Sequence, residues 1–67
     1  MKTYTLFWTF GETQLVHGDS PADAMNKAGL GAGTLRTLDF YAEGDVAQNY
    51  KWIEQNHVWE KMVQEDL

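Results

Sequence analysis

The sequence predicts an α+β fold, a mostly antiparallel sheet of about five strands with one short helix packed on one face. Three observations predict it. Residues 2–10 alternate in polarity, and the stretch "GDSPADAMNKAG" has the start and stop signals of a helix. The stretch "YKWIEQNHVWEKM" places two tryptophans symmetrically about a turn-forming pair. We therefore expect one domain over residues 1–67, with the element order β-β-α-β-β-β.

The first expected strand is half-buried, because alternation with β-branched and aromatic residues is typical of such strands. One of its faces carries Tyr4, Leu6, Trp8 and Phe10, and the other carries Thr3, Thr5, Phe7 and Thr9. Gly11 and Glu12 then favour a turn. Residues 13–18 return as a second strand, so that the two strands form a hairpin.

The expected helix follows this hairpin. Ser20 is a good N-cap, Pro21 suits the first helical position, and Asp23 stands where a capping box has its acid. Gly29 is expected at the C′ position, with Leu30 making the hydrophobic contact of a Schellman end. The buried face is mostly alanine, which would let the helix lie close to a sheet with large side chains.

A third strand is expected over residues 35–43. Leu38, Phe40 and Ala42 would point one way, and Thr37, Asp39, Tyr41 and Glu43 the other. Before it, Gly29, Gly31 and Gly33 resemble a phosphate-binding loop in composition. Such a loop follows a strand and opens a helix, whereas this run follows a helix, so we interpret it as a helix end and a loop.

The last two strands are expected to meet in a tight turn at Gln55-Asn56. The cross-strand pairs would then be Tyr50–Lys61, Lys51–Glu60, Trp52–Trp59 and Ile53–Val58. The tryptophans would share the face of Tyr50 and lie toward the helix. Ile53 and Val58 would remain exposed beside a salt bridge between Lys51 and Glu60.

The net charge of −5 argues against direct nucleic-acid binding. Phosphate recognition requires clustered bases, and the five bases of this chain are scattered. No run of residues is long and apolar enough for a membrane span, and the first ten residues are predicted to be a strand and not a signal peptide. We expect a cytoplasmic protein that binds neither membrane nor nucleic acid.

The sequence offers no catalytic or metal-binding motif. It has no cysteine, and His17 and His57 lack ligand-like spacing, so we expect neither an enzyme nor a cofactor. A deep pocket lined by His17 or Trp8 would instead favour a small-ligand binder or an enzyme.

Candidate partner-binding residues form two groups. Asp39, Tyr41, Glu43 and Asp45 are expected to make an acidic stripe suited to Arg or Lys of a protein partner. Ile53, Val58 and Phe7 are expected on the sheet face that one helix cannot cover. The hypothesis is an acidic protein-binding module that docks on a basic surface. The alternative is a structural module that forms a homodimer through the uncovered face.

In layout, "GDSPADAMNKAG" followed by "YKWIEQNHVWEKM" resembles small acidic proteins of phages and mobile elements, including some anti-CRISPR proteins. The resemblance lies in the order of elements: strands, a Ser-capped Ala-rich helix, then a Trp-containing hairpin. It implies an inhibitor that presents carboxylates to a basic nucleic-acid channel of its target. Asp39, Glu43 and Asp45 would be the candidate contacts.

Overall fold

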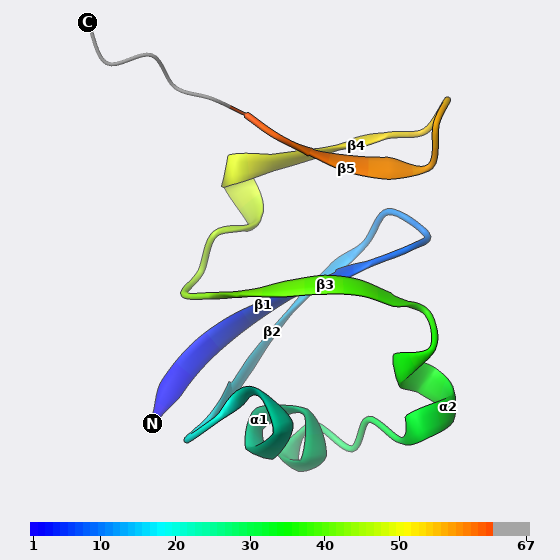
Figure 1. Ribbon diagram of the computed structural model, residues 1–67. Coiled ribbons are helices and arrows are strands. Elements are labelled where there is room, and N and C mark those ends of the chain that lie inside the picture. Colours follow the sequence, from blue (N-terminus) through cyan, green and yellow to red (C-terminus); the bar gives the residue numbers. More distant parts are fainter. Residues whose placement is uncertain (63–67) are drawn as a thin grey trace, which may run out of the picture.

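The computed structural model describes residues 1–62, and the chain in this range builds three layers (Figure 1). The elements are β1 (Lys2–Trp8), β2 (Thr13–Gly18), α1 (Pro21–Lys27), α2 (Ala32–Leu35), β3 (Leu38–Glu43), the 3-10 turn η1 (Ala47–Asn49), β4 (Tyr50–Ile53) and β5 (Val58–Lys61). The α+β class with antiparallel strands is confirmed. The strands are divided between a sheet of order β2-β1-β3 and a separate hairpin, β4-β5.

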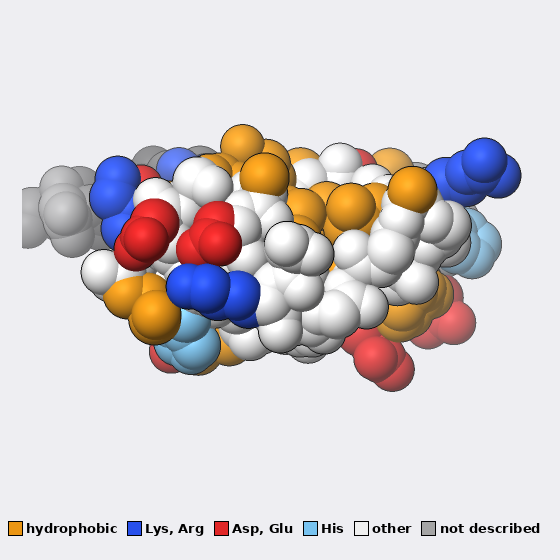
Figure 2. Space-filling view, turned by 90° about the horizontal axis from the view of Figure 1, so that it is seen from below, with side chains coloured by type: hydrophobic (Ala, Val, Ile, Leu, Met, Phe, Trp, Pro, Cys, Tyr) orange, Lys and Arg blue, Asp and Glu red, His pale blue; other side chains and the backbone are white. Residues whose placement is uncertain are grey.

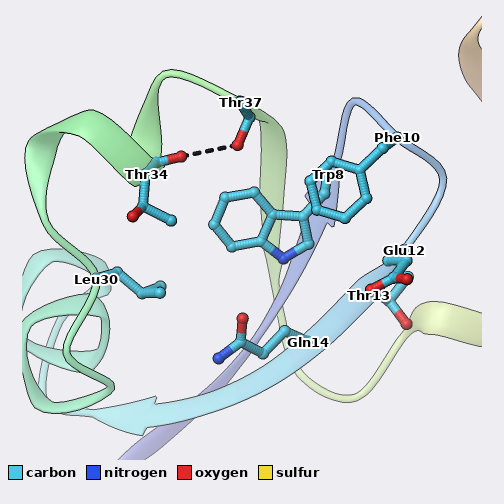
Figure 3. A pocket seen from close by; sticks show the side chains of 8 residues that line it. All are labelled: Trp8, Phe10, Glu12, Thr13, Gln14, Leu30, Thr34 and Thr37. Carbon is cyan, nitrogen blue, oxygen red and sulfur yellow. Dashed lines mark hydrogen bonds between the residues drawn. The ribbon is translucent and has the colours of Figure 1, made fainter.

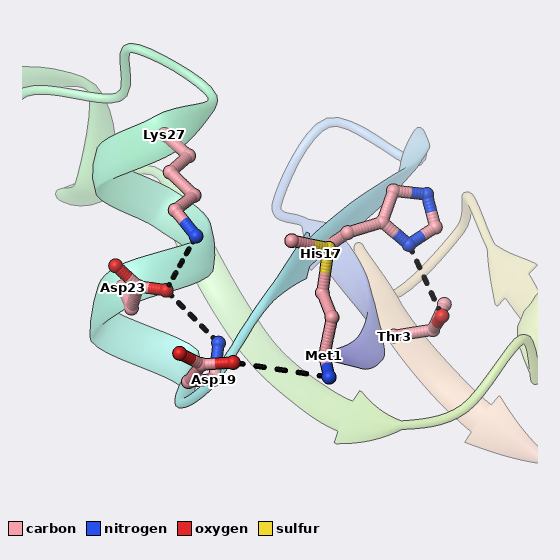
Figure 4. Close-up of polar contacts among 6 residues, drawn as sticks. All are labelled: Met1, Thr3, His17, Asp19, Asp23 and Lys27. Atoms are coloured by element: carbon pink, nitrogen blue, oxygen red, sulfur yellow. Dashed lines mark hydrogen bonds and ion pairs between the residues drawn. The ribbon is translucent and has the colours of Figure 1, made fainter.

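Helix α1 has the ends that its sequence predicts. The Ser20 hydroxyl accepts a hydrogen bond from the Asp23 backbone N–H at 3.1 Å, and the Asp23 carboxylate accepts one from the Asp19 N–H at 2.9 Å (Figure 4). At the other end, Gly29 has a φ of +78°. The Leu30 N–H donates to the Met25 carbonyl at 3.1 Å, which is the bond that defines a Schellman end.

Helix α1 packs closely on β2 because the residues at their closest approach, Gly18 and Ala24, have small side chains or none. A Cβ on Gly18 would lie 2.5 Å from the Ala24 nitrogen, and Ala24 itself is completely buried. The helix-side core contains Tyr4, Leu6, Trp8, Val16, Ala24 and Met25. The expectation that alanines let the helix approach large sheet side chains is consistent with this packing.

Strand β3 contains a bulge, and the predicted alternation of its side chains is wrong at this point. The strand begins at Leu38, because the preceding residues of the expected strand 35–43 enter α2 and its end. Phe40 pairs with Phe7 while Leu38 pairs with Trp8, so two residues of β3 oppose one of β1. Paired side chains share a face, so Leu38 points toward the helices and Phe40 away from them.

Both faces of β1 are buried, which corrects the expectation of one uncovered sheet face. The β4-β5 hairpin lies against the face opposite α1 (Figure 1). Phe7, fully buried, has its ring centroid 4.4 Å from that of Phe40, 4.6 Å from Tyr50 and 5.1 Å from Trp59. These aromatic rings form the second core of the domain.

The β4-β5 hairpin has the predicted register, including the Trp52–Trp59 pair with ring centroids 5.4 Å apart. Its turn differs: Ile53 pairs with Val58, so four residues connect the strands, and the positive φ of 53° falls on His57. The expected position of the tryptophans toward the helix is wrong. Trp59 packs on Phe7, on the face of β1 opposite α1, because the side chain of Phe7 points to that face.

Two contacts fix the hairpin to the sheet. The Trp59 indole N–H donates to the Trp8 carbonyl at 2.8 Å. The Trp52 indole lies directly against Gly11, where an added Cβ would be 2.9 Å from the ring. Since Gly11 has a φ of +89°, glycine is required there both for the turn and for this close approach.

We predict that Gly11→Ala lowers the free energy of unfolding by about 2 kcal/mol, because alanine strains the left-handed backbone and displaces the Trp52 indole. Gly33→Ala is the matched control: nothing lies within 4 Å of its Cβ position, and helix propensity favours alanine there. Urea denaturation measures both variants. Equal stability of the two variants would contradict the role given to Gly11.

The cap of α1 predicts a pH dependence. The Asp19 N–H, and after it the Lys27 ammonium 3.1 Å away, hold the pKa of Asp23 below its ordinary value. A carboxyl with a lowered folded-state pKa contributes stability above its unfolded pKa and loses it as the pH falls through the folded pKa. We expect Asp23→Asn to reduce the acid-induced loss of stability below about pH 4.

The matched control is Ser20→Ala, which removes an uncharged cap acceptor and lowers stability by about 1 kcal/mol. Its effect should be the same at acid and neutral pH. Urea denaturation from pH 2 to pH 7 separates the two variants, and identical pH profiles for Asp23→Asn and the unmodified chain would refute the assignment.

Candidate protein-binding surface

The structure distributes the predicted partner-binding residues over three places. Asp39, Tyr41, Glu43 and Asp45 follow one another on and just after β3, whereas Ile53 and Val58 lie on the hairpin. Phe7 is fully buried, so its expected place on an exposed face is wrong, because the hairpin covers that face. The acidic residues therefore follow one sheet edge along its length, and Ile53 and Val58 lie on a different surface.

Tyr41 and Glu43 point to the helix side of the sheet, where α1 packs over β2 and β1 and leaves β3 open. The Tyr41 side chain is 47% exposed, with its ring edge-on to Tyr4 at 6.2 Å. The Glu43 carboxylate lies 3.9 Å from the Lys2 ammonium, and both side chains are exposed. Viewed from this side, hydrophobic side chains gather along the upper part of the molecule, and acidic side chains lie beside basic ones at the left (Figure 2).

The other two acids have no such neighbour. Within residues 1–62, neither Asp39 nor Asp45 lies within 4.0 Å of a basic group. Asp39 is exposed in the bulge of β3. We name Asp39, Tyr41, Glu43 and Asp45 together the β3 acidic edge, because β3 is an outer strand of its sheet.

The carboxyl-terminal part of the β3 acidic edge is held by a buried threonine. The Thr5 hydroxyl donates to the Gly44 carbonyl at 2.6 Å and accepts from the Val46 N–H at 3.1 Å. Asp45 thus lies between two anchored residues. Thr5 is 1% exposed, and both bonds are partly buried. The exposed carboxylate is presented on a fixed backbone.

Ile53 and Val58 form a cross-strand pair on the outer face of the hairpin, away from the aromatic core. Val58 is 44% exposed and Ile53 is half-buried, so the pair does present apolar surface. Lys51 and Glu60 pair beside it, but the expected salt bridge is wrong: no such ion pair lies within 4.0 Å among the described residues. This surface lies in a different layer from the β3 acidic edge (Figure 1).

The two histidines lie in different parts of the structure. The His17 ring contacts the Thr3 hydroxyl at 3.1 Å (Figure 4), and the His57 ring lies edge-on to Trp52 in the hairpin turn. In residues 1–62 no three His, Asp or Glu side chains are grouped so that they could hold a metal ion. The same residues contain no helix long and apolar enough to cross a membrane.

Among the open hollows that the described residues line are two that the sequence did not predict. The larger, of about 380 Å³, is lined by Trp8, Phe10, Glu12, Thr13, Gln14, Leu30, Thr34 and Thr37 (Figure 3). The smaller, of about 260 Å³, is lined in part by His17. The larger depends on α2, a four-residue helix that the sequence did not predict. In the sequence, Trp8 was the one residue of this lining that had been considered for a ligand pocket.

Comparisons with known proteins give no relative for this chain: no family model, no curated protein and no solved structure matches it.

Proposed function

We propose that the chain is an acidic protein-binding module and that it binds a basic protein surface through the β3 acidic edge. The observation that carries the proposal is the position of Asp39 and Asp45, which are exposed on either side of a half-exposed Tyr41 and have no ion-pair partner within residues 1–62. An arginine of a partner can stack on the ring of a tyrosine and form ion pairs with carboxylates on either side of it.

Electrostatics supports this choice of partner. With a net charge of −5, the chain attracts basic surfaces over a distance of about one Debye length, roughly 8–10 Å at moderate salt. Because Thr5 fixes the backbone around Asp45, less conformational entropy is lost when a partner binds. Both effects favour association that is fast and sensitive to salt.

The more specific form of the proposal is inhibition. By the layout resemblance to small phage and mobile-element proteins, the partner would be a cytoplasmic nucleic-acid-handling protein. The carboxylates of Asp39, Glu43 and Asp45 would occupy the positions of phosphates in its channel. Binding alone would block the channel, so the chain itself needs no chemistry.

The homodimer alternative loses its premise, since the face expected to be free is covered by β4 and β5. Two copies that met at β3 would also bring like charges together, which is unfavourable.

We predict that reversing both unpaired charges, Asp39→Lys with Asp45→Lys, weakens partner binding by roughly tenfold or more at low salt. The control is Glu54→Lys with Glu60→Lys, which makes the same change in net charge at two exposed acids of the hairpin. Immobilised chains capture partners from lysate, isotope labelling quantifies them, and the purified partner is then titrated with each variant. The control should stay within about twofold of the unmodified chain.

Equal weakening by both variants would show that only net charge matters and would overturn the assignment to the β3 acidic edge. Unchanged binding by the first variant would overturn the electrostatic proposal altogether. The inhibitor form is tested separately, by asking whether the chain displaces a fluorescent oligonucleotide from the purified partner.

A further inference from the structure

The larger hollow, which we name the Trp8 groove, is built by five segments that meet at one end of the sheet. Trp8 ends β1, Phe10 and Glu12 come from the β1–β2 loop, and Gln14 lies on β2. Leu30, Thr34 and Thr37 close the groove from the α1 end and the α2 region (Figure 3). Its volume of about 380 Å³ falls within the usual range of small-ligand sites.

The floor of the Trp8 groove has a hydrogen-bond donor that has no partner among residues 1–62. Trp8 is only 4% exposed, yet no hydrogen bond from its indole N–H is present among the described residues. No side-chain nitrogen or oxygen of the described residues is both fully enclosed and unpaired, so this N–H is accessible to solvent. Trp8 also lines the groove. Figure 3 shows the indole nitrogen on the side of Gln14. Nearly buried N–H groups are usually paired, which makes this donor a point of recognition.

The remaining walls define what could bind there. Gln14 offers both a donor and an acceptor, and the Glu12 carboxylate offers acceptors alone. Phe10, stacked on Trp8 with centroids 6.0 Å apart and 57% exposed, and Leu30 provide apolar contact at the two ends. No Lys or Arg lines the groove, so a phosphate or carboxylate would be repelled by Glu12 without compensation.

We propose that the Trp8 groove binds a small, uncharged, flat heteroaromatic molecule with an amino group next to a ring nitrogen. The ring nitrogen would accept from the Trp8 N–H, and the amino group would donate to Gln14 or Glu12. The ring would lie against the aromatic and aliphatic walls. An unphosphorylated aminopyrimidine or aminopurine base has this pattern of donor and acceptor. This binding is independent of the β3 acidic edge.

Cytosine is the probe, because it is neutral at pH 7 and carries the amino group beside a ring nitrogen. It is titrated into the ¹⁵N-labelled full chain and followed by the three tryptophan indole N–H signals. We expect a saturable shift of the Trp8 signal with a Kd on the order of 1 mM, as suits an open groove and a small ligand. The Trp59 N–H, already bonded to the Trp8 carbonyl, should shift less.

Two variants test the contacts. Gln14→Ala and Glu12→Gln should each weaken cytosine binding severalfold, whereas Glu54→Gln, an exposed acid in the other hairpin, should leave it unchanged. Dispersed amide spectra show that each variant is folded. Uracil, which replaces the amino group with a carbonyl, should bind several times more weakly than cytosine.

Any of three results would overturn the proposal. The first is no saturable shift of the Trp8 signal up to about 30 mM cytosine, which exceeds the expected Kd by far. The second is equal binding of uracil. The third is tighter binding of cytidine monophosphate or of a cytosine oligonucleotide than of cytosine, which would show that the groove recognises a phosphorylated ligand and not an uncharged base.

Discussion

The structure depends on the burial of β1 from both sides, and Phe7 is the centre of the second side. A helix with a short alanine-rich face covers only the side of Leu6 and Val16. Without the hairpin, Phe7 and Phe40 would lie in water, and the sheet would have a single small core. The hairpin covers them with Tyr50 and Trp59, so that four aromatic rings pack together. A chain of 67 residues without cysteine gains its second core in this way.

This arrangement determines which surfaces remain for recognition. Because both faces of β1 are covered, a partner can reach the outer edge of β3, the outside of the hairpin, or the open end beside Trp8. The β3 acidic edge follows from the bulge, which leaves Asp39 exposed while Leu38 and Phe40 enter separate cores. The bulge of β3 therefore directs Leu38 and Phe40 into the two cores and also leaves the Asp39 carboxylate on the surface.

Local chemistry made part of this fold predictable. The caps of α1 depend on neighbours within a few residues, so Ser20, Gly29 and Leu30 could be assigned from the sequence. The hairpin register followed from the symmetric spacing of Trp52 and Trp59. The bulge of β3 could not be predicted, because it depends on which residue of β1 each residue of β3 opposes. The division into two sheets, and with it the burial of Phe7, depends on contacts over about 50 residues of chain. The Trp8 groove needed α2, which is too short to have a periodic pattern.

The coupling free energy between Phe7 and Trp59 tests most directly whether the hairpin completes the core. It is obtained from the unfolding free energies of Phe7→Leu, Trp59→Leu and the double variant. If the two rings stabilise one cooperative unit, the coupling should be about 0.5–1.5 kcal/mol. Strictly additive effects of the two substitutions would contradict this account and would show that the hairpin folds independently of the three-stranded sheet.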